Sequence, residues 1–206
     1  MVHSRVREPR QVRSRQRVAR LVDAAERILA RDGYDGLTMH RLAKAAHVPV
    51  GTFYQFFDDK DAIVEVLAQR YVALTAQLIE GRIDEILGSP PGTRLAAAYG
   101  SFVDLYRSNP AYRALRAARY TSPALERADN ANVDAAIEGV RRIVTTGTRI
   151  RDSARVRAAS RTLQLLFDAL LYRAGELRAQ DVDAFIPEAK AILSALENDA
   201  IRRLST

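Results

Sequence analysis

Helical periodicity runs through almost the entire chain and limits what the chain can fold into more than any other feature. Apolar residues recur three or four positions apart, as one face of an α-helix requires, and no segment sustains the alternating pattern of a half-buried strand. The sequence therefore predicts an all-α fold of about nine helices. The apolar stripe nearest the N-terminus consists of Val18, Leu21, Val22, Ala25, Ile28 and Leu29.

Turn and cap signals divide this periodic sequence into separate helices. Gly33 follows the first stripe and can take the left-handed conformation that often ends a helix. Thr38, Asp58 and Asp152 are the expected N-caps of three later helices. Pro187 either lies in the first turns of the last helix or kinks it. After the first helix, the expected helices cover 39–46, 49–56 or 50–56, 59–81, 93–107, 110–121, 123–147, 153–175 and 182–203.

Positive charge is concentrated near the N-terminus. The net charge is +7, and residues 1–20 hold seven arginines and one glutamate. A basic arm of this kind favours a polyanionic partner, because neutralising phosphates releases the counterions condensed on them. The same run of charge is equally compatible with a solvated tail that has no partner.

Several classes of protein are disfavoured by what the sequence lacks. It has no cysteine, which excludes disulfides and thiolate metal sites. We see no apolar run of membrane-spanning length and no signal-peptide core, so we expect a cytoplasmic protein without a membrane partner. There is no glycine-rich phosphate loop, and no carboxylates complete a metal site with the three histidines. We therefore expect no enzyme, no cofactor and no metal.

Residues 38–57, TMHRLAKAAHVPVGTFYQFF, form the pattern with the most functional content. Two short helices here flank a tight turn, an arrangement that can place the second helix in the major groove of DNA. The surrounding sequence, residues 16–67, resembles the N-terminal domain of the tetracycline-repressor (TetR) family. The resemblance lies in Ala24-Ala25, Ile28-Leu29, Gly33-Tyr34, Leu37-Thr38, Leu42-Ala43, Ala46, Val48, Gly51-Thr52-Phe53-Tyr54, Phe57, Lys60 and Ile63.

The resemblance implies DNA contacts of three kinds. Thr38, Tyr54 and Lys60 would contact the phosphate backbone, which sets the register on the duplex without reading its sequence. The N-terminal arm, with Arg13 and Arg17 as its named contacts, would enter the flanking minor groove. Base reading would fall to one position of the first short helix and three early positions of the second: His40, Val50, Gly51 and Thr52.

The remaining positions of this region are interpreted from their residue types. Phe53 and Phe57 fit the core better than a DNA-facing surface, whereas Arg41 suits solvent and phosphate equally well. His47 stands where the family usually has glycine, so it has to accept a conformation that glycine adopts freely. Phe56 stands where tyrosine or histidine is common, which removes one phosphate hydrogen bond that the family leads us to expect.

The rest of the chain resembles the family only in being helical and of suitable length. In the family, these helices enclose a small-molecule pocket, and the last two pair with their copies in a dimer. Wide apolar stripes agree with the dimer, although an ordinary core also explains them. The expected interface consists of Leu163, Leu166, Leu170, Phe185, Ala189, Ile192, Leu193 and Leu196. The candidate pocket residues, for which core packing is the simpler explanation, are Phe102, Tyr106, Arg116, Tyr120 and Phe167.

These expectations combine into one hypothesis about organisation and function. Residues 1–15 form a basic arm that is disordered or contacts DNA, 16–62 the helix-turn-helix domain, and 63–206 the ligand-binding and dimerisation domain. The homodimer binds a near-palindromic operator in double-stranded DNA and, as a repressor, leaves it when a small-molecule effector binds. The alternatives with the same fold are an activator and a ligand-independent DNA-binding or architectural protein.

Overall fold

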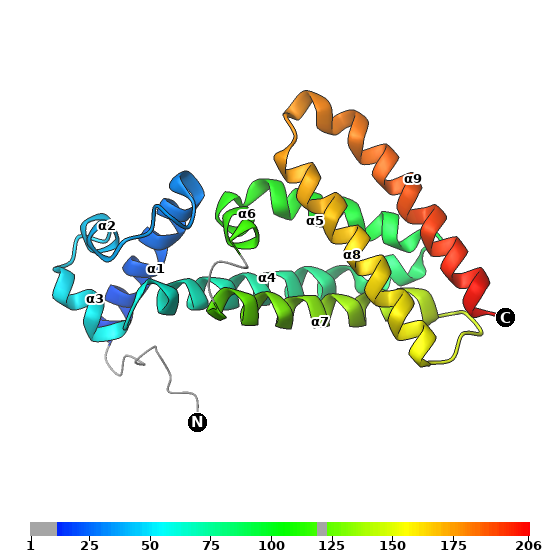
Figure 1. Ribbon diagram of the computed structural model, residues 1–206, viewed down its shortest axis with the longest axis horizontal. Coiled ribbons are helices and arrows are strands. Elements are labelled where there is room, and N and C mark those ends of the chain that lie inside the picture. The colour runs from blue at the N-terminus through cyan, green and yellow to red at the C-terminus, as the bar shows by residue number, and fades with distance from the viewer. Residues whose placement is uncertain (1–11, 119–122) are drawn as a thin grey trace. The chain divides into compact units, whose positions relative to one another are not determined.

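The structure, a computed structural model, describes residues 12–118 and 123–206. Within these residues it contains nine α-helices and no β-strand, which confirms the expected all-α fold. Figure 1 shows the helices in chain order, coloured from blue to red. They are α1 (Val12–Asp32), α2 (Met39–Ala45), α3 (Val50–Phe56), α4 (Lys60–Gly88), α5 (Arg94–Ser108), α6 (Pro110–Ala117), α7 (Pro123–Thr145), α8 (Ala154–Glu176) and α9 (Ala179–Leu204).

The helices belong to two compact units, and α4 and α7 contribute residues to both. Unit 1 consists of the chain up to Ala73 together with Asn109–Asn130, and unit 2 of Leu74–Ser108 together with Ala131–Thr206. In unit 1, α1 packs against α2 and α6, and α2 packs against α3. In unit 2, α5 packs against α8 and α9, which also pack against each other (Figure 1).

The apolar stripe of α1 lies in the core of unit 1. Leu21, Ala25 and Leu29 are completely buried there. Burying a leucine side chain stabilises the fold by about 1.5–3 kcal/mol. Burial of this stripe therefore supplies much of the free energy that holds α1 against the rest of unit 1. The residues that complete this core come from α2, α3, the residue after α3 and the first turns of α4: Leu42, Phe53, Phe57, Ile63 and Leu67.

A buried glutamate fixes the beginning of α5 in unit 2. Glu197 of α9 is completely buried, and its two carboxyl oxygens accept hydrogen bonds from the backbone N–H groups of Gly92 and Leu95, both at 2.8 Å. The Leu95 N–H is one of the first donors of α5, which have no partner within the helix, and the Gly92 N–H belongs to the loop just before it. Burial raises the pKa of Glu197, while the hydrogen bonds from Leu95 and Gly92 oppose that shift.

A buried arginine supplies hydrogen bonds to backbone carbonyl groups at the end of α7. The Arg94 guanidinium donates to the carbonyl oxygens of Ile143 at 3.1 Å and Thr146 at 2.6 Å, and also to Ser89 at 2.9 Å. The final carbonyls of a helix have no partner within the helix, so a cation with several donors is well suited to this position. Arg94 therefore joins the loop before α5 to the C-terminal end of α7.

The helix ends confirm two of the expected signals and correct two others. Gly33 ends α1 with φ +68, and the hydroxyl oxygen of Thr38 caps α2 by accepting from the Arg41 N–H at 3.3 Å. The predicted caps at Asp58 and Asp152 were wrong by one residue. The side chain that caps α4 is Asp59, and the one that caps α8 is Ser153.

The largest difference from expectation concerns the length of α4. It continues through Gly81, where the sequence analysis ended it, and stops only at Gly88. Burial of Ile86 on the added turns offsets the modest cost of an internal glycine, about 1 kcal/mol. By length and composition alone α4 could cross a membrane, with a mean hydropathy of 1.3 over its most apolar window, which the sequence analysis did not anticipate. The buried side chains of Ile63 and Leu67 instead identify its first half as a core helix.

Two other helices differ from their expected bounds by three or more residues at one end. α9 begins at Ala179 rather than 182, so Pro187 lies inside this helix. α6 ends at Ala117, before the expected 121.

Candidate nucleic-acid interface

The turn between α2 and α3 depends on an unusual backbone conformation at His47. Its φ of 55 is the only positive value found at a non-glycine position in the described residues. Backbone hydrogen bonds from His47 to Lys44 at 3.2 Å and from Val48 to Ala43 at 3.0 Å close the end of α2. The chain can then begin α3 directly after Pro49. His47 thus adopts the left-handed conformation that the sequence analysis expected of it.

The two sides of α3 have different surroundings. Phe53 and the adjoining Phe57 are completely buried, with their ring centroids 5.5 Å apart, which confirms their expected place in the core. Phe56 is also buried, so it is a core residue at the position where the family often has a polar side chain. Tyr54 faces outward with 45% of its surface exposed, and its ring packs edge-on against Phe53 at 5.6 Å. The core therefore holds an exposed phenol in place.

The other residues expected to contact DNA differ in exposure. His40 and Thr38 at the start of α2 are exposed, as is Gly51 in the first turn of α3. Val50 and Thr52 are half-buried, which leaves only part of each side chain accessible. Arg13 and Arg17 are exposed on the first turns of α1, which already begins at Val12. Residues 1–11 of the basic arm lie outside the described residues.

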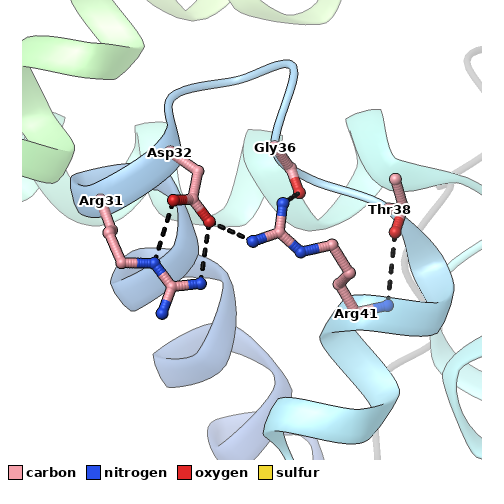
Figure 2. Close-up of polar contacts among 5 residues, drawn as sticks. All are labelled: Arg31, Asp32, Gly36, Thr38 and Arg41. Carbon is pink, nitrogen blue, oxygen red and sulfur yellow. Dashed lines mark hydrogen bonds and ion pairs between the residues drawn. The ribbon is translucent and has the colours of Figure 1, made fainter.

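Arg41, for which solvent and phosphate seemed equally suitable, instead holds the loop between α1 and α2. Its guanidinium donates to the carbonyl oxygen of Gly36 at 2.8 Å and forms an ion pair with Asp32. Arg31 binds the same carboxylate from the other side, with both contacts at 2.9 Å (Figure 2). The hydrogen bond from Arg31, together with that from Arg41, lowers the pKa of Asp32 to about 2. No sequence pattern pointed to this cluster.

Lys60 contacts a ring within unit 1. Its ammonium nitrogen lies 4.0 Å from the centroid of the Tyr34 ring, which is a favourable position for a cation over an aromatic face. The Tyr34 hydroxyl donates to the carboxylate of Asp61, the residue after Lys60. The two contacts fix the first turn of α4 to the loop that follows α1.

A second set of contacts joins α4 to α1 farther along the helix. The Tyr71 hydroxyl and the Arg70 guanidinium both donate to Glu26 of α1, the latter at 2.9 Å. The Tyr71 ring also stacks on Tyr112 of α6, with centroids 5.0 Å apart. Within unit 1, therefore, α4 is fixed to both α1 and α6.

The candidate pocket residues are not all brought together. Phe102 of α5 and Phe167 of α8 meet edge to face with centroids 5.6 Å apart, and Tyr106 is buried on α5. Arg116 is buried in unit 1, while Tyr120 lies outside the described residues. A groove of about 730 Å³ opens instead between α4 and α5 in unit 2, at residues that the sequence analysis did not select.

The expected dimer residues divide into buried and accessible positions. Leu163, Ala189 and Leu193 are buried within unit 2, whereas Leu170, Phe185 and Leu196 are half-buried. Leu166 and Ile192 are 38% and 50% exposed. Two further apolar side chains that the sequence analysis did not select, Leu165 and Tyr172, are also exposed on α8, at 65% and 41%.

Family models match both parts of the chain. The model for bacterial regulatory proteins of the tetR family matches residues 21–67, and the model for the tetracyclin repressor-like C-terminal domain matches residues 90–196. The first match contains the helix-turn-helix. The second covers more than half of the chain by itself, so the relationship is not limited to the N-terminal helices.

Two curated relatives and two solved structures illustrate the similarity. An uncharacterised HTH-type transcriptional regulator of Haemophilus influenzae is 37% identical over 65 residues, which cover 32% of this chain and 35% of that protein. The HTH-type transcriptional regulator HbdR of an Aromatoleum species is 28% identical over 155 residues, 73% of this chain and 66% of that protein. The matched region thus spans between about a third and two thirds of these relatives.

Among solved structures, a transcriptional regulator of Rhodococcus sp. Rha1 superposes with a TM-score of 0.70 at 21% identity, covering 92% of this chain and 98% of the other. The multidrug binding protein EbrR, complexed with malachite green, superposes with a TM-score of 0.68 at 20% identity, covering 88% and 98%. These likenesses show a shared fold. Together with the two family models, they establish that the chain belongs to the tetR family of bacterial regulatory proteins.

Proposed function

We propose that the chain is a sequence-specific DNA-binding transcriptional regulator, acting as a homodimeric repressor that a small-molecule effector releases from a near-palindromic operator. The observation that supports DNA binding most strongly is the accessible face of α3. Tyr54 and Gly51 are exposed there while Phe53 and Phe57 anchor the helix from behind. A helix held rigidly with one face open has the geometry for insertion into the major groove.

In this proposal, phosphate contacts position the protein on DNA. The Thr38 oxygen already accepts the capping hydrogen bond of α2, but its O–H group can donate to a phosphate. The Tyr54 phenol donates in the same way. Lys60 has three N–H donors, so its ammonium can contact a phosphate while it remains over the Tyr34 ring.

Base reading involves few side chains. His40 offers ring nitrogens, and the accessible parts of Val50 and Thr52 can meet thymine methyl groups. Gly51 allows the backbone of α3 to approach the bases closely. Arg13 and Arg17, which are exposed on the first turns of α1, add positive charge with which they strengthen binding or read the width of the minor groove. Recognition therefore relies substantially on DNA shape.

The dimer in this proposal forms through α8 and α9. The exposed Leu165, Leu166, Tyr172 and Ile192 provide an apolar surface that water disfavours. A twofold pairing through this surface would supply the two α3 helices that a palindromic site requires. A regulator of this kind works in the cytoplasm, where its DNA is.

The test is fluorescence anisotropy of a labelled duplex taken from the DNA upstream of the coding sequence, in competition with unrelated DNA. We expect a specific complex whose affinity falls steeply as salt rises. Tyr54→Phe, which removes one phosphate hydrogen bond, should weaken binding by about fivefold to tenfold. Thr206→Val likewise removes one hydroxyl, at an exposed position outside both α3 and the proposed dimer surface, and should bind as the wild type does. Equal affinity for specific and unrelated DNA, or equal loss in both variants, would contradict the proposal.

A further inference from the structure

The groove between α4 and α5 has the size and composition of a small-molecule site. Its volume of about 730 Å³ falls within the range of ordinary ligand pockets. Leu78 and Leu105 provide apolar walls, while Arg82, Asp104 and Arg107 bring charge to the same space. All of these residues belong to unit 2.

Arg82 has a hydrogen-bonding capacity that the protein leaves unused. Its Nε–H is buried and has no hydrogen-bond partner. The neighbouring Nη2 donates to Glu85 at 2.9 Å, but this contact occupies only one arm of the Nε–Nη2 edge that a carboxylate can bind with both oxygens. A buried N–H without an acceptor is uncommon and calls for a specific explanation, such as a missing ligand.

The present partner of Arg82 is easily displaced. The side chain of Glu85 is 70% exposed, and that of Arg82 is 42% exposed. Exposed ion pairs of this kind contribute little to stability. A carboxylate entering from the groove can therefore replace Glu85 at Nη2, and a small rotation of the guanidinium then brings Nε–H into the same two-point contact.

Arg107 gives the groove its second positive charge, and hydrogen bonds to the end of α8 fix the position of its guanidinium. One of its guanidinium nitrogens donates to the carbonyl oxygens of Ala174 at 2.9 Å and Leu177 at 3.4 Å, at the end of α8. The lining holds two guanidinium groups and a single carboxylate, that of Asp104, so the lining residues carry a net positive charge, which the Glu85 carboxylate outside the lining offsets until it is displaced. Positive charge between apolar walls favours an anion that also has an apolar part.

We propose that this groove binds a small organic carboxylate, with Arg82 as its principal ligand and the leucine walls holding its hydrocarbon part. The inference rests on the proposed function for its regulatory meaning, because it names the chemical class of the effector. The contacts of Arg107 with the end of α8 connect the groove to one of the two helices of the proposed dimer. Binding alters operator affinity only to the extent that the carboxylate prefers one state of the protein.

The experiment is isothermal titration calorimetry of the full-length protein with three probes: hexanoate, the uncharged hexanamide of nearly equal shape, and inorganic phosphate. Hexanoate should bind at least about tenfold more tightly than either of the others, because only it offers both a carboxylate and a hydrocarbon chain. Hexanamide binding as tightly as hexanoate would overturn the role of the charge. Phosphate binding as tightly would overturn the role of the apolar walls.

Two variants should change hexanoate affinity in opposite directions. Arg82→Gln should lower it by about tenfold or more, whereas Glu85→Gln, which removes the competing carboxylate, should raise it by about twofold to fivefold. Arg142→Gln removes the same charge from an exposed position of α7 outside the groove lining and should leave the affinity unchanged. If Arg82→Gln binds hexanoate as tightly as the wild type does and has the same melting temperature, Arg82 is not the ligand of the carboxylate and the proposed site is refuted.

The outcomes separate this inference from the proposed function. Calorimetry requires no DNA, so a carboxylate site is established or refuted whether or not an operator complex forms. A protein that binds its operator but not hexanoate refutes the inference alone. A protein that binds hexanoate but no specific DNA refutes the proposed function alone.

Discussion

At the scale of single residues, the clearest strain in the described chain lies at His47. A side chain with a Cβ in the left-handed region costs about 1 kcal/mol relative to glycine. His47→Gly should therefore stabilise the fold by about 0.5–1 kcal/mol, as measured by chemical denaturation. His47→Ala keeps the Cβ and serves as the control, with no comparable gain expected. A destabilised His47→Gly protein would show that the imidazole itself is needed for the turn.

Ser160 provides a second test, because its hydroxyl is completely buried without a hydrogen-bond partner. Ser160→Ala should leave stability unchanged or raise it by up to about 1 kcal/mol, since the folded protein no longer buries an unpaired polar group. The same substitution at Ser153, the N-cap of α8, should cost about 1 kcal/mol. The melting temperature should therefore stay the same or rise for Ser160→Ala and fall for Ser153→Ala. A loss of equal size in both would disprove the distinction.

The cap residues also show where sequence reasoning reaches its limit. Asp58 and Asp59 are equally good caps by residue type, as are Asp152 and Ser153 by general preference. The N-cap is the residue whose backbone is extended and whose side chain hydrogen-bonds to the first turn of the helix. Tertiary packing decides which of the two adjacent residues that is. Thr38 was predictable because no competing cap stands beside it.

At the scale of elements, the loop between α1 and α2 depends on the Asp32 carboxylate between Arg31 and Arg41 (Figure 2). The pKa of this carboxyl in the folded protein is about 2, below its ordinary value of 3.8. The stability that ionised Asp32 contributes is therefore complete above about pH 4 and disappears as the pH falls toward 2.

The corresponding prediction compares wild type with Asp32→Asn by chemical denaturation across this range. The difference in unfolding free energy should be constant above about pH 4 and shrink steadily toward pH 2. Asp35→Asn changes the net charge equally within the same loop and corrects for that effect. A wild-type advantage that persists undiminished at pH 2 would contradict the role assigned to Asp32.

Helix lengths and buried polar groups were only partly predictable. Apolar periodicity together with the turn and cap signals indicated about nine helices, and nine are found in the described residues, because periodicity records which face of a helix is buried. Gly81 misled the interpretation of α4, since a glycine ends a helix only where the chain must turn, and here Ile86 is buried beyond it. Glu197 did leave a signal: it stands on the buried stripe of α9, between Leu193 and Ala200, where a charge needs a partner. Its partners were not predictable, because they are backbone groups at and just before the start of α5, far away in the sequence.

The candidate site shows the same division. Phe53 and Phe57 were assigned to the core from residue type alone, and the structure agrees. The role of Arg41 was not predictable, because its partner Asp32 lies on another helix and no sequence spacing marks the pair. The groove at Arg82 was missed because a charged residue on a helix usually faces solvent, and only the fold reveals its unpaired nitrogen.

At the scale of the whole molecule, the accessible apolar side chains of α8 and α9 predict the oligomeric state. Ile192→Glu places a charge at a half-exposed apolar position and should shift the protein toward monomer at micromolar concentration in sedimentation equilibrium. Ala191→Glu adds the same charge at the next exposed position, about 100° around the helix, and should remain dimeric. A wild-type protein that is monomeric at this concentration would refute the interface outright.

Whether two copies of α3 bind one operator can be measured by hydroxyl-radical footprinting of the upstream DNA. We expect two protected regions related by the operator's twofold axis, with centres about one helical turn apart, or roughly 34–36 Å. Ile192→Glu, which disfavours the dimer, should weaken the protection of both regions together. Protection confined to one region, or an unprotected duplex at protein concentrations that saturate the anisotropy signal, would show that two copies of α3 do not bind one operator.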